Sequence, residues 1–395
     1  MKKRILLVHN YYQIPGGEDT VVRNEKKLLE DNGNIVFLYT RNNREIKSFN
    51  IFQKLLVPFK TIFNFKTYRD IKKIIKEKKI DIVHVHNTLA LISPSVFYAA
   101  KKFKIPIIQT IHNFRMECPS GTFYRDNHIC EDCLKKGLGC SLKHKCYRNS
   151  FWETLFMVIG IKLNRKMGIY KKAYFICLTE FNRQKLLEIN KLSKNIIIDE
   201  SHCFVKPNFT FDSSKELITF ANRENVFIFA GRLEINKGFK WLLENWKRNY
   251  PDLLVFGEGS LKMWGIDFIK KNKIKNILLK GQLPHDELLD FIKISKAVIV
   301  PSLWFEGFPM LFLEAMSFGT PLLASNIGNA SNLIKEGING WHFQIENSET
   351  LKTGIENVEN QDIMDKEIQY FQLNFSSKKN FQTLEQIYKK ILEKN

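Results

Sequence analysis

Residues 297–320 constrain the fold of this chain most. They comprise an apolar run, a short glycine-containing loop and the start of a helix. The run Ala-Val-Ile-Val-Pro-Ser at 297–302 predicts a buried strand that ends at its proline. The loop after it contains Glu306 and Gly307, and a helix is expected to begin near Met310. A helix that starts at the carboxyl edge of a parallel sheet presents free backbone N–H groups, which suit phosphate oxygens. The stretch therefore predicts an α/β fold with an anion-binding loop.

Two carboxylates belong to this loop and helix. Glu306 lies in the loop, and Glu314 is expected about one turn into the helix. Phosphates would repel both, so we expect contacts with a sugar and with a ribose. Two acidic residues at this separation occur by chance in most proteins, and only their setting gives the pattern weight.

A second glycine-bounded turn carries two cations. The apolar run 226–230 predicts a strand, and Arg232 and Lys237 follow it between Gly231 and Gly238. Two cations at the mouth of one strand suit a nucleotide diphosphate, and Arg can bind phosphate through two parallel bonds.

The first half of the chain repeats the strand–loop–helix pattern. A strand is predicted at 4–8, and the adjacent Gly16 and Gly17 precede a helix, where they would let a ligand approach the backbone. By itself a Gly-Gly pair is more often only a turn. The strand predicted at 107–111 ends at His112, at the sheet edge where open α/β sheets bind ligands.

These motifs resemble those of a known enzyme family. The segment Glu306-Gly307-Phe308-Pro309…Glu314-Ala315…Gly319-Thr320-Pro321 closely resembles the donor-site motif of retaining GT4 glycosyltransferases. Residues 231–238 match the family's diphosphate clamp, and Val205-Lys206-Pro207-Asn208-Phe209 matches its domain crossing. The resemblance implies the GT-B fold, in which two Rossmann-like, doubly wound α/β domains face each other across a cleft.

The domain boundaries expected from this resemblance follow the motifs. Residues 1–205 would form the N-terminal, acceptor-side domain, with a cysteine-rich insert at 112–150. Residues 206–375 would form the nucleotide-sugar-binding domain, and the polar stretch 210–224 is the best linker candidate. Residues 376–395 would form a helix that packs back on the N-terminal domain.

The resemblance also implies roles for single residues. The cations and the backbone N–H groups at 308–311 would neutralise the leaving diphosphate, Glu314 would hold the ribose, and Glu306 would hold the donor sugar. The predicted catalytic residues are Glu306, His112, Arg232 and Lys237. The predicted donor-binding residues are Gly16, Gly17, Arg232, Lys237, Leu283, Phe308, Met310, Leu311 and Glu314. Because no Asp-x-Asp occurs in the sequence, we expect the cations to replace a catalytic metal.

Positive charge is concentrated in the first half of the chain. Residues 1–200 hold 37 Lys or Arg and 18 Asp or Glu, whereas the remainder holds 24 and 23. Apolar and basic residues alternate in 46–66, which suits either an interfacial membrane helix or an ordinary amphipathic helix. No apolar run approaches the roughly 18 residues of a membrane span. Lys2-Lys3-Arg4 precedes only a strand-length apolar run, so we expect a cytoplasmic protein, peripheral on the inner membrane, with a lipid-linked acceptor.

Five of the seven cysteines lie between positions 118 and 146. The Cys-x2-Cys pair with thiols on both sides predicts a structural four-thiolate zinc site, and it resembles a cysteine-containing insert of some GT4 enzymes. The chosen ligands are Cys118, Cys130, Cys133 and Cys146, and Cys140, His128 or His144 could replace one of them. Disulfides and unmetallated thiols are the alternatives.

The function expected is transfer of a hexose, with retention, from a UDP- or GDP-linked sugar to a hydroxyl acceptor such as a lipid-linked polysaccharide precursor. A zinc-containing nucleic-acid-binding protein is the alternative of another class, although no base-reading helix follows the cysteines. A sugar-nucleotide epimerase is the nearer alternative. A nicotinamide site at Gly257-Glu258-Gly259 is rejected, because position 262 is Lys rather than Gly.

Overall fold

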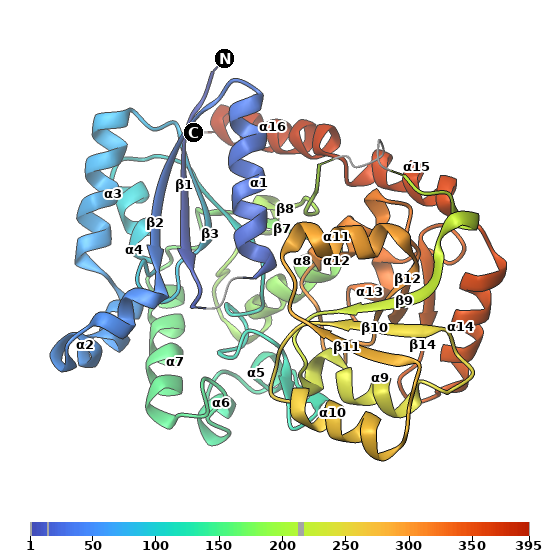
Figure 1. Cartoon of the computed structure of the whole chain (residues 1–395). Helices are drawn as coiled ribbons and strands as arrows, with labels where there is room; N and C mark the ends of the chain where they lie inside the picture. Colours follow the sequence, from blue (N-terminus) through green and yellow to red (C-terminus); the bar gives the residue numbers. More distant parts are fainter. Residues whose placement is uncertain (1, 14–15, 212–216, 395) are drawn as a thin grey trace. The chain divides into compact units, whose positions relative to one another are not determined.

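The chain folds into two compact units, each built on one sheet. The computed structural model describes residues 2–13, 16–211 and 217–394 (Figure 1). Unit 1 holds the residues up to Phe123, Cys130–Pro207 and the residues from Asn380 on. Unit 2 holds Tyr124–Ile129 and Asn208–Lys379.

Unit 1 is built on a six-stranded sheet in the order β2-β1-β3-β4-β7-β8, in which every pair is parallel. The strands are β1 Arg4–Tyr11, β2 Ile35–Asn42, β3 Ile82–Asn87, β4 Ile107–Ile111, β7 Tyr174–Cys177 and β8 Cys203–Val205. Central strands such as β3 are buried along their whole length, which is why they appear in the sequence as apolar runs. The strand order changes direction between β1 and β3, and ligands bind at such a point in open α/β sheets.

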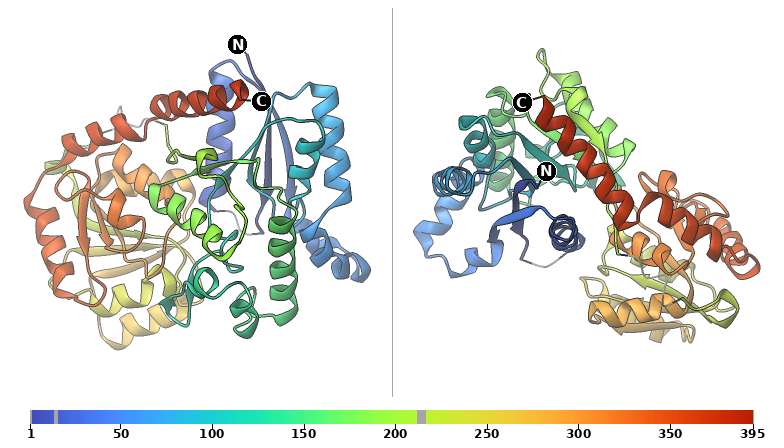
Figure 2. Two further views of the ribbon diagram at one scale, coloured as in Figure 1. Left: turned by 180° about the vertical axis from the view of Figure 1, so that it is seen from behind. Right: turned by 90° about the horizontal axis from the view of Figure 1, so that it is seen from above.

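Helices cover both faces of this sheet. They are α1 Gly17–Asp31, α2 Ile51–Ile62, α3 Phe65–Lys78, α4 Ser95–Lys102, α5 Asp132–Lys135, α6 Cys140–Lys143, α7 Phe151–Lys166, α8 Glu180–Leu187 and α16 Ser377–Glu393, with 3-10 turns η1 Asn43–Ser48, η2 Glu188–Leu192 and η3 Glu200–His202. The last helix, red in Figure 2, packs Leu384, Tyr388 and Ile391 against Ile5 and Leu7 of β1. Its apolar residues recur every three or four positions, and they therefore form one buried stripe.

Unit 2 repeats the architecture with the strand order β11-β10-β9-β12-β13-β14, again parallel throughout. The strands are β9 Glu224–Ala230, β10 Asp252–Phe256, β11 Ile277–Gly281, β12 Ser295–Val300, β13 Leu322–Ser325 and β14 Gly340–Phe343. The helices are α9 Phe239–Asn245, α10 Lys262–Lys271, α11 His285–Ile294, α12 Met310–Ser317, α13 Ala330–Leu333, α14 Glu349–Asn360 and α15 Met364–Asn374, with turns η5 Phe220–Asn222 and η6 Ile235–Lys237. The hairpin of β5 Tyr124–Arg125 and β6 His128–Ile129 groups with this unit.

One glycine fixes the turn that follows β9. Gly238 has a φ of 74°, and a Cβ atom there would lie 1.8 Å from the carbonyl oxygen of Pro301. Only glycine fits this close approach. The turn that carries Lys237 is thereby pressed against the end of β12.

The two parallel-sheet units confirm the predicted α/β class. Of the predicted linker 210–224, residues 212–216 lie outside the described part, and 220–222 form the short turn η5. Within the described residues, no helix is both long and apolar enough to cross a membrane.

Candidate active site

The carboxylate of Glu306 is the centre of the candidate site in unit 2. Its Oε1 atom accepts hydrogen bonds from Lys237 Nζ at 2.7 Å, Ser302 Oγ at 2.6 Å and Trp304 Nε1 at 2.8 Å. Burial alone would raise the pKa of Glu306, but Lys237 and the two neutral donors hold it below its usual range. Among the described residues no hydrogen bond reaches Oε2. The side chain is therefore an ionised carboxylate with one oxygen anchored and one available.

Two asparagines hold the backbone of the same loop. Asn329 Nδ2 donates to the carbonyl oxygens of Glu306 at 2.5 Å and Gly307 at 2.6 Å. Asn208 Nδ2 donates to the carbonyl oxygen of Phe308 at 3.2 Å. These bonds fix the peptide planes that lead into the first turn of α12, whose N–H groups are the predicted phosphate donors. Sequence reasoning missed both asparagines as site residues, although Asn208 lies in the motif 205–209.

The two predicted cations differ in their surroundings. Lys237 lies 5.2 Å from the ring centre of Trp304 and is ion-paired with Glu306, so the structure joins two residues that were predicted for separate tasks. Arg232 is exposed, and no ion pair to it forms within the described residues. An exposed, unpaired guanidinium at the end of β9 remains available to an anion.

Glu314 lies in the middle of α12 and is buried. Burial raises its pKa, and the nearby His285, with Nε2 at 3.6 Å from Glu314 Oε1, acts to lower it. His285 was not predicted and begins α11, two residues after the predicted Leu283, which is half-buried.

Unit 1 has a cavity of about 100 Å³ at the carboxyl ends of β3 and β4. Polar side chains that line it include His86, His112, Asn113 and Arg115, and α7 supplies apolar wall residues. The structure thus places the predicted His112 in a cavity wall. His86, which was not among the predicted site residues, lies beside it, with 3.0 Å between His86 Nδ1 and His112 Nε2.

The predicted glycines lie at the start of α1, near a buried polar cluster. Gly16 and Gly17 are exposed, and a Cβ atom on Gly16 would meet nothing within 4 Å, so this turn is open. The preceding residues 14 and 15 lie outside the described part. Asp19 Oδ2 accepts from the Gly16 N–H at 3.1 Å, and Asp19 Oδ1 lies 2.8 Å from Nε2 of the buried His9. Burial raises the pKa of Glu18, in the same cluster, to about 8.

The four predicted zinc ligands all belong to unit 1, and all seven cysteines are free thiols. A hydrogen bond between Cys118 and Cys133 is the largest cause that lowers the pKa of Cys118 to about 5. Cys130 and Cys146 also act electrostatically on Cys133, so the four thiols lie in one neighbourhood. Among the described residues, however, only Glu25, His84 and His86 bring three or more potential metal-binding atoms within 4.8 Å of one another. The four thiols therefore lie near one another without forming so tight a group, and zinc there stays a prediction.

Comparisons with known proteins identify the class of enzyme. The model "Glycosyl transferases group 1" matches residues 211–373, and "Glycosyltransferase Family 4" matches residues 15–136. A crystal structure of a glycosyltransferase from Rickettsia africae superposes with a TM-score of 0.67 at 20% identity, covering all of both chains. The crystal structure of Anabaena Alr3699/HepE in complex with UDP superposes with a TM-score of 0.63 at 15% identity, and the match covers 99% of this chain and 100% of that one.

Two of the curated relatives are named for the reaction that they catalyse. The Salmonella typhimurium lipopolysaccharide 1,2-N-acetylglucosaminetransferase is 32% identical over 33% of this chain and 38% of its own length. The Escherichia coli UDP-Gal:alpha-D-GlcNAc-diphosphoundecaprenol alpha-1,3-galactosyltransferase is 23% identical over 72% of this chain and 67% of its own length. The chain is a glycosyltransferase with the GT-B fold. Its two family matches, to the group 1 model and to the Family 4 model, lie in different parts of the chain.

Proposed function

We propose that this glycosyltransferase moves a hexose, with retention, from a nucleotide diphosphate sugar to a hydroxyl of a lipid-linked polysaccharide precursor. The arrangement around Glu306 is the observation that carries the proposal. An ionised carboxylate, held on one oxygen by a lysine and open on the other, lies where the loop enters α12. Carboxylate and cation side by side suit a ligand that joins a sugar to a diphosphate.

In the proposed reaction the acceptor oxygen bonds to the anomeric carbon as the bond from that carbon to the diphosphate oxygen breaks. Arg232, the ammonium of Lys237 and backbone N–H groups at 308–311 stabilise the charge on the departing diphosphate. The hydroxyl proton passes to that diphosphate on the same face, so the configuration is retained. Glu306 Oε2 accepts from a sugar hydroxyl, and Glu314 accepts from the ribose.

The donor is inferred to carry UDP. The Escherichia coli relative is named for UDP-Gal, and the Anabaena neighbour was solved with UDP. GDP remains the alternative donor base, because residues 277–283 would contact the base partly through backbone. We assign residues 1–205 to the acceptor side, with 376–395 packed on them, and residues 206–375 to the donor side.

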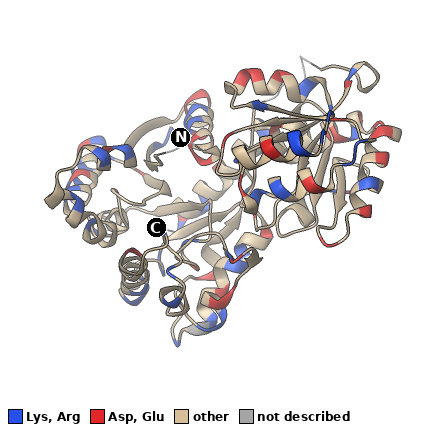
Figure 3. Cartoon of the chain, turned by 60° about the horizontal axis from the view of Figure 1, so that its bottom comes forward, with Lys and Arg blue, Asp and Glu red and all other residues tan. Residues whose placement is uncertain are grey.

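The lipid-linked acceptor is inferred from an apolar and basic surface on unit 1. Helix α2 has no buried residue, and Phe52 is 75% exposed. Helix α2 packs on α7 through Phe59 and Phe156, whose ring centres are 4.9 Å apart. Trp152 of α7 is 67% exposed. The same two helices carry lysines at positions 54, 60, 162 and 166. Figure 3 shows Lys and Arg in blue. Such a surface suits peripheral contact with an anionic membrane.

Zinc at the cysteines of unit 1 is a separate proposal. Closure of Cys118, Cys130, Cys133 and Cys146 around one ion would give four protein ligands, and such a site serves structure rather than catalysis. We expect one zinc per chain by elemental analysis and its loss in Cys133→Ser. A metal-free protein of full thermal stability would refute the zinc proposal and would leave the proposed transferase function unaffected.

Calorimetric titration with UDP, GDP and their sugar conjugates tests the proposed donor site. We expect one nucleotide to bind, with binding abolished in Arg232→Ala. Arg248→Ala is the matched control, because Arg248 is exposed and bonds to the carbonyl oxygen of Asn272 in the same unit. Absence of binding by every nucleotide would overturn the proposal. Turnover of the donor without an acceptor would favour an epimerase, and tight binding of nucleic acid would favour the other alternative.

A further inference from the structure

A chain of buried hydrogen bonds runs from the core of unit 1 to the cavity. We propose that Glu25 and His86 are positioning residues that hold His112 as its Nε2–H tautomer, leaving Nδ1 as the hydrogen-bond acceptor that the ring offers to the cavity. The ligand group that this acceptor takes is a hydroxyl, and the choice of a sugar hydroxyl rests on the proposed function.

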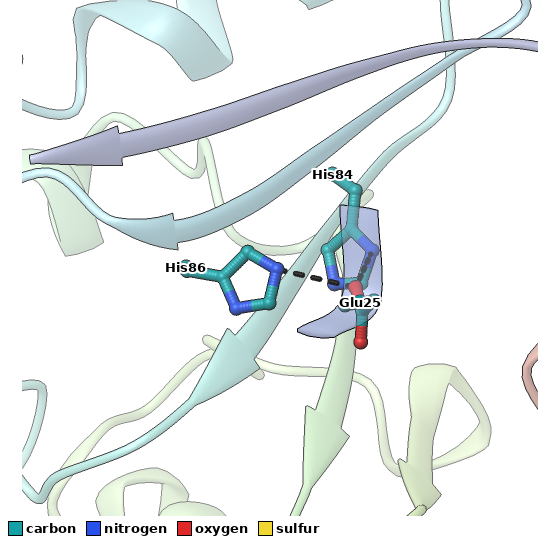
Figure 4. Close-up of side chains that lie close together, drawn as sticks. All are labelled: Glu25, His84 and His86. Carbon is teal, nitrogen blue, oxygen red and sulfur yellow. Dashed lines mark hydrogen bonds and ion pairs between the residues drawn. The ribbon is translucent and has the colours of Figure 1, made fainter. Parts of the chain in front are cut away.

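The series of hydrogen bonds begins at Glu25, which comes from α1 and is fully buried. Its Oε2 lies 3.3 Å from Lys206 Nζ, and its Oε1 lies 3.0 Å from His84 Nδ1 and 3.2 Å from His86 Nε2. Figure 4 shows the carboxylate joined to both rings. Burial opposes ionisation, but His84, Lys206 and His86 lower the pKa of Glu25 well below its usual range. An ionised carboxylate only accepts hydrogen bonds, so the proton of His86 must lie on Nε2.

The second link is the pair of neighbouring histidines. Burial lowers the pKa of His86 to about 4, so near neutral pH its ring carries one proton, and Nδ1 is an acceptor. That atom lies 3.0 Å from His112 Nε2, which must therefore donate. Burial, followed by His86 and His9, lowers the pKa of His112 well below its usual value. His112 is thus also neutral, and its Nδ1 has no proton.

A metal ion at Glu25, His84 and His86 is the alternative explanation of this cluster. The position next to the carboxylate is already held by the ammonium of Lys206, which also donates to Asn380 Oδ1 at 3.0 Å. Both nitrogens of His84 have protein partners, with Tyr388 Oη 2.6 Å from Nδ1 and Thr110 Oγ1 2.8 Å from Nε2. A divalent cation would displace these bonds and be repelled by the lysine. The cluster is better described as a hydrogen-bonded network.

The network matters because it gives the cavity an acceptor. Within the described residues no side chain or backbone group bonds to His112 Nδ1, and the half-buried ring lines the cavity. A bare ring nitrogen accepts from a hydroxyl and repels a phosphate or carbonyl oxygen. Were the tautomer reversed, the same ring would present a donor and select the opposite ligand group.

The tautomer can be read directly from wild-type protein with 15N-labelled histidine rings. Long-range 1H–15N correlation at pH 7 should show His112 with a protonated Nε2 and a bare Nδ1, assigned by their loss in His112→Gln. A protonated Nδ1, a doubly protonated ring, or one divalent metal ion per chain that is lost in His86→Gln would overturn the proposal. The double variant Glu25→Gln/Lys206→Met removes both buried charges together and should give a mixture of tautomers. An unchanged single tautomer in that folded variant would refute the role of Glu25.

The same spectra separate this inference from the proposed function. Titration with UDP-linked and GDP-linked sugars should shift the His112 Nδ1 resonance if a sugar hydroxyl binds there. The predicted tautomer without any response to sugar nucleotides would leave the positioning role standing and count against the donor assignment.

Discussion

Replacing Lys237 by Met should weaken catalysis through two losses at once. The ammonium donates to Glu306 at 2.7 Å and has further N–H groups free for a diphosphate. Its side chain is 23% exposed and that of Glu306 is 10% exposed, so the pair is only partly screened by solvent. A hydrogen bond to a charged group contributes about 1.5–3 kcal/mol. We therefore expect kcat/KM for the sugar nucleotide to fall about 10- to 150-fold, at about 1.4 kcal/mol per tenfold.

Initial-rate kinetics at saturating acceptor measure this change, and Lys240→Met is the matched control. Lys240 lies three residues away, is exposed, and pairs with Glu244 at 3.8 Å on the surface. Such a pair contributes at most about 1 kcal/mol to stability, and we expect no change in kcat/KM. Equal rates in the two variants would refute the reasoning from the Lys237–Glu306 geometry.

Three further predictions follow from buried and exposed groups. Lys237 helps to hold the pKa of Glu306 below its usual range. As the pH is lowered, the activity of Lys237→Met should therefore be lost at a higher pH than the activity of the wild type. Identical pH–activity profiles for the two proteins would contradict this. Burial raises the pKa of Glu117 to about 8. The folded protein therefore loses stability as the pH rises from the pKa that Glu117 has in the unfolded chain toward 8. Glu117→Gln should therefore raise the free energy of unfolding at pH 7 by about 1–3 kcal/mol in urea denaturation, and by much less at pH 4; an equal effect at both pH values would show that Glu117 is ionised in the fold. Phe52→Ser/Leu55→Ser should reduce cosedimentation with anionic liposomes without changing thermal stability, and unchanged cosedimentation would remove α2 from the membrane contact.

The elements of the fold were predictable where burial shapes the sequence. Residues 298–300 and 226–230 are apolar runs because parallel strands are covered on both faces. The last helix was predicted at 376–395 and is observed at Ser377–Glu393, where Leu384, Ile387 and Ile391 repeat at helical spacing. These signals are local, so a single sequence contains them.

The contacts that shape the candidate site are not local. Lys237 and Glu306 are separated by 69 residues, and Glu25 and His86 by 61. Nothing near Glu25 in the sequence distinguishes it from the solvated acids of an amphipathic helix. Only the packing of α1 on the sheet brings its carboxylate to the two histidines and to Lys206. The cysteines show the opposite case, in which a strong local pattern predicted a metal site, but the four thiols do not all lie within 4.8 Å of one another among the described residues.

The configuration at the anomeric carbon of the transferred sugar shows whether the proposed transfer with retention takes place. The wild-type enzyme would be incubated with the UDP-sugar that binds best and a lipid diphosphate acceptor, and the product examined by 1H NMR. We expect an α-glycoside from an α-linked donor, and a strong loss of product with Glu306→Gln at unchanged thermal stability. A β-glycoside, or full activity in Glu306→Gln, would rule out the proposed mechanism.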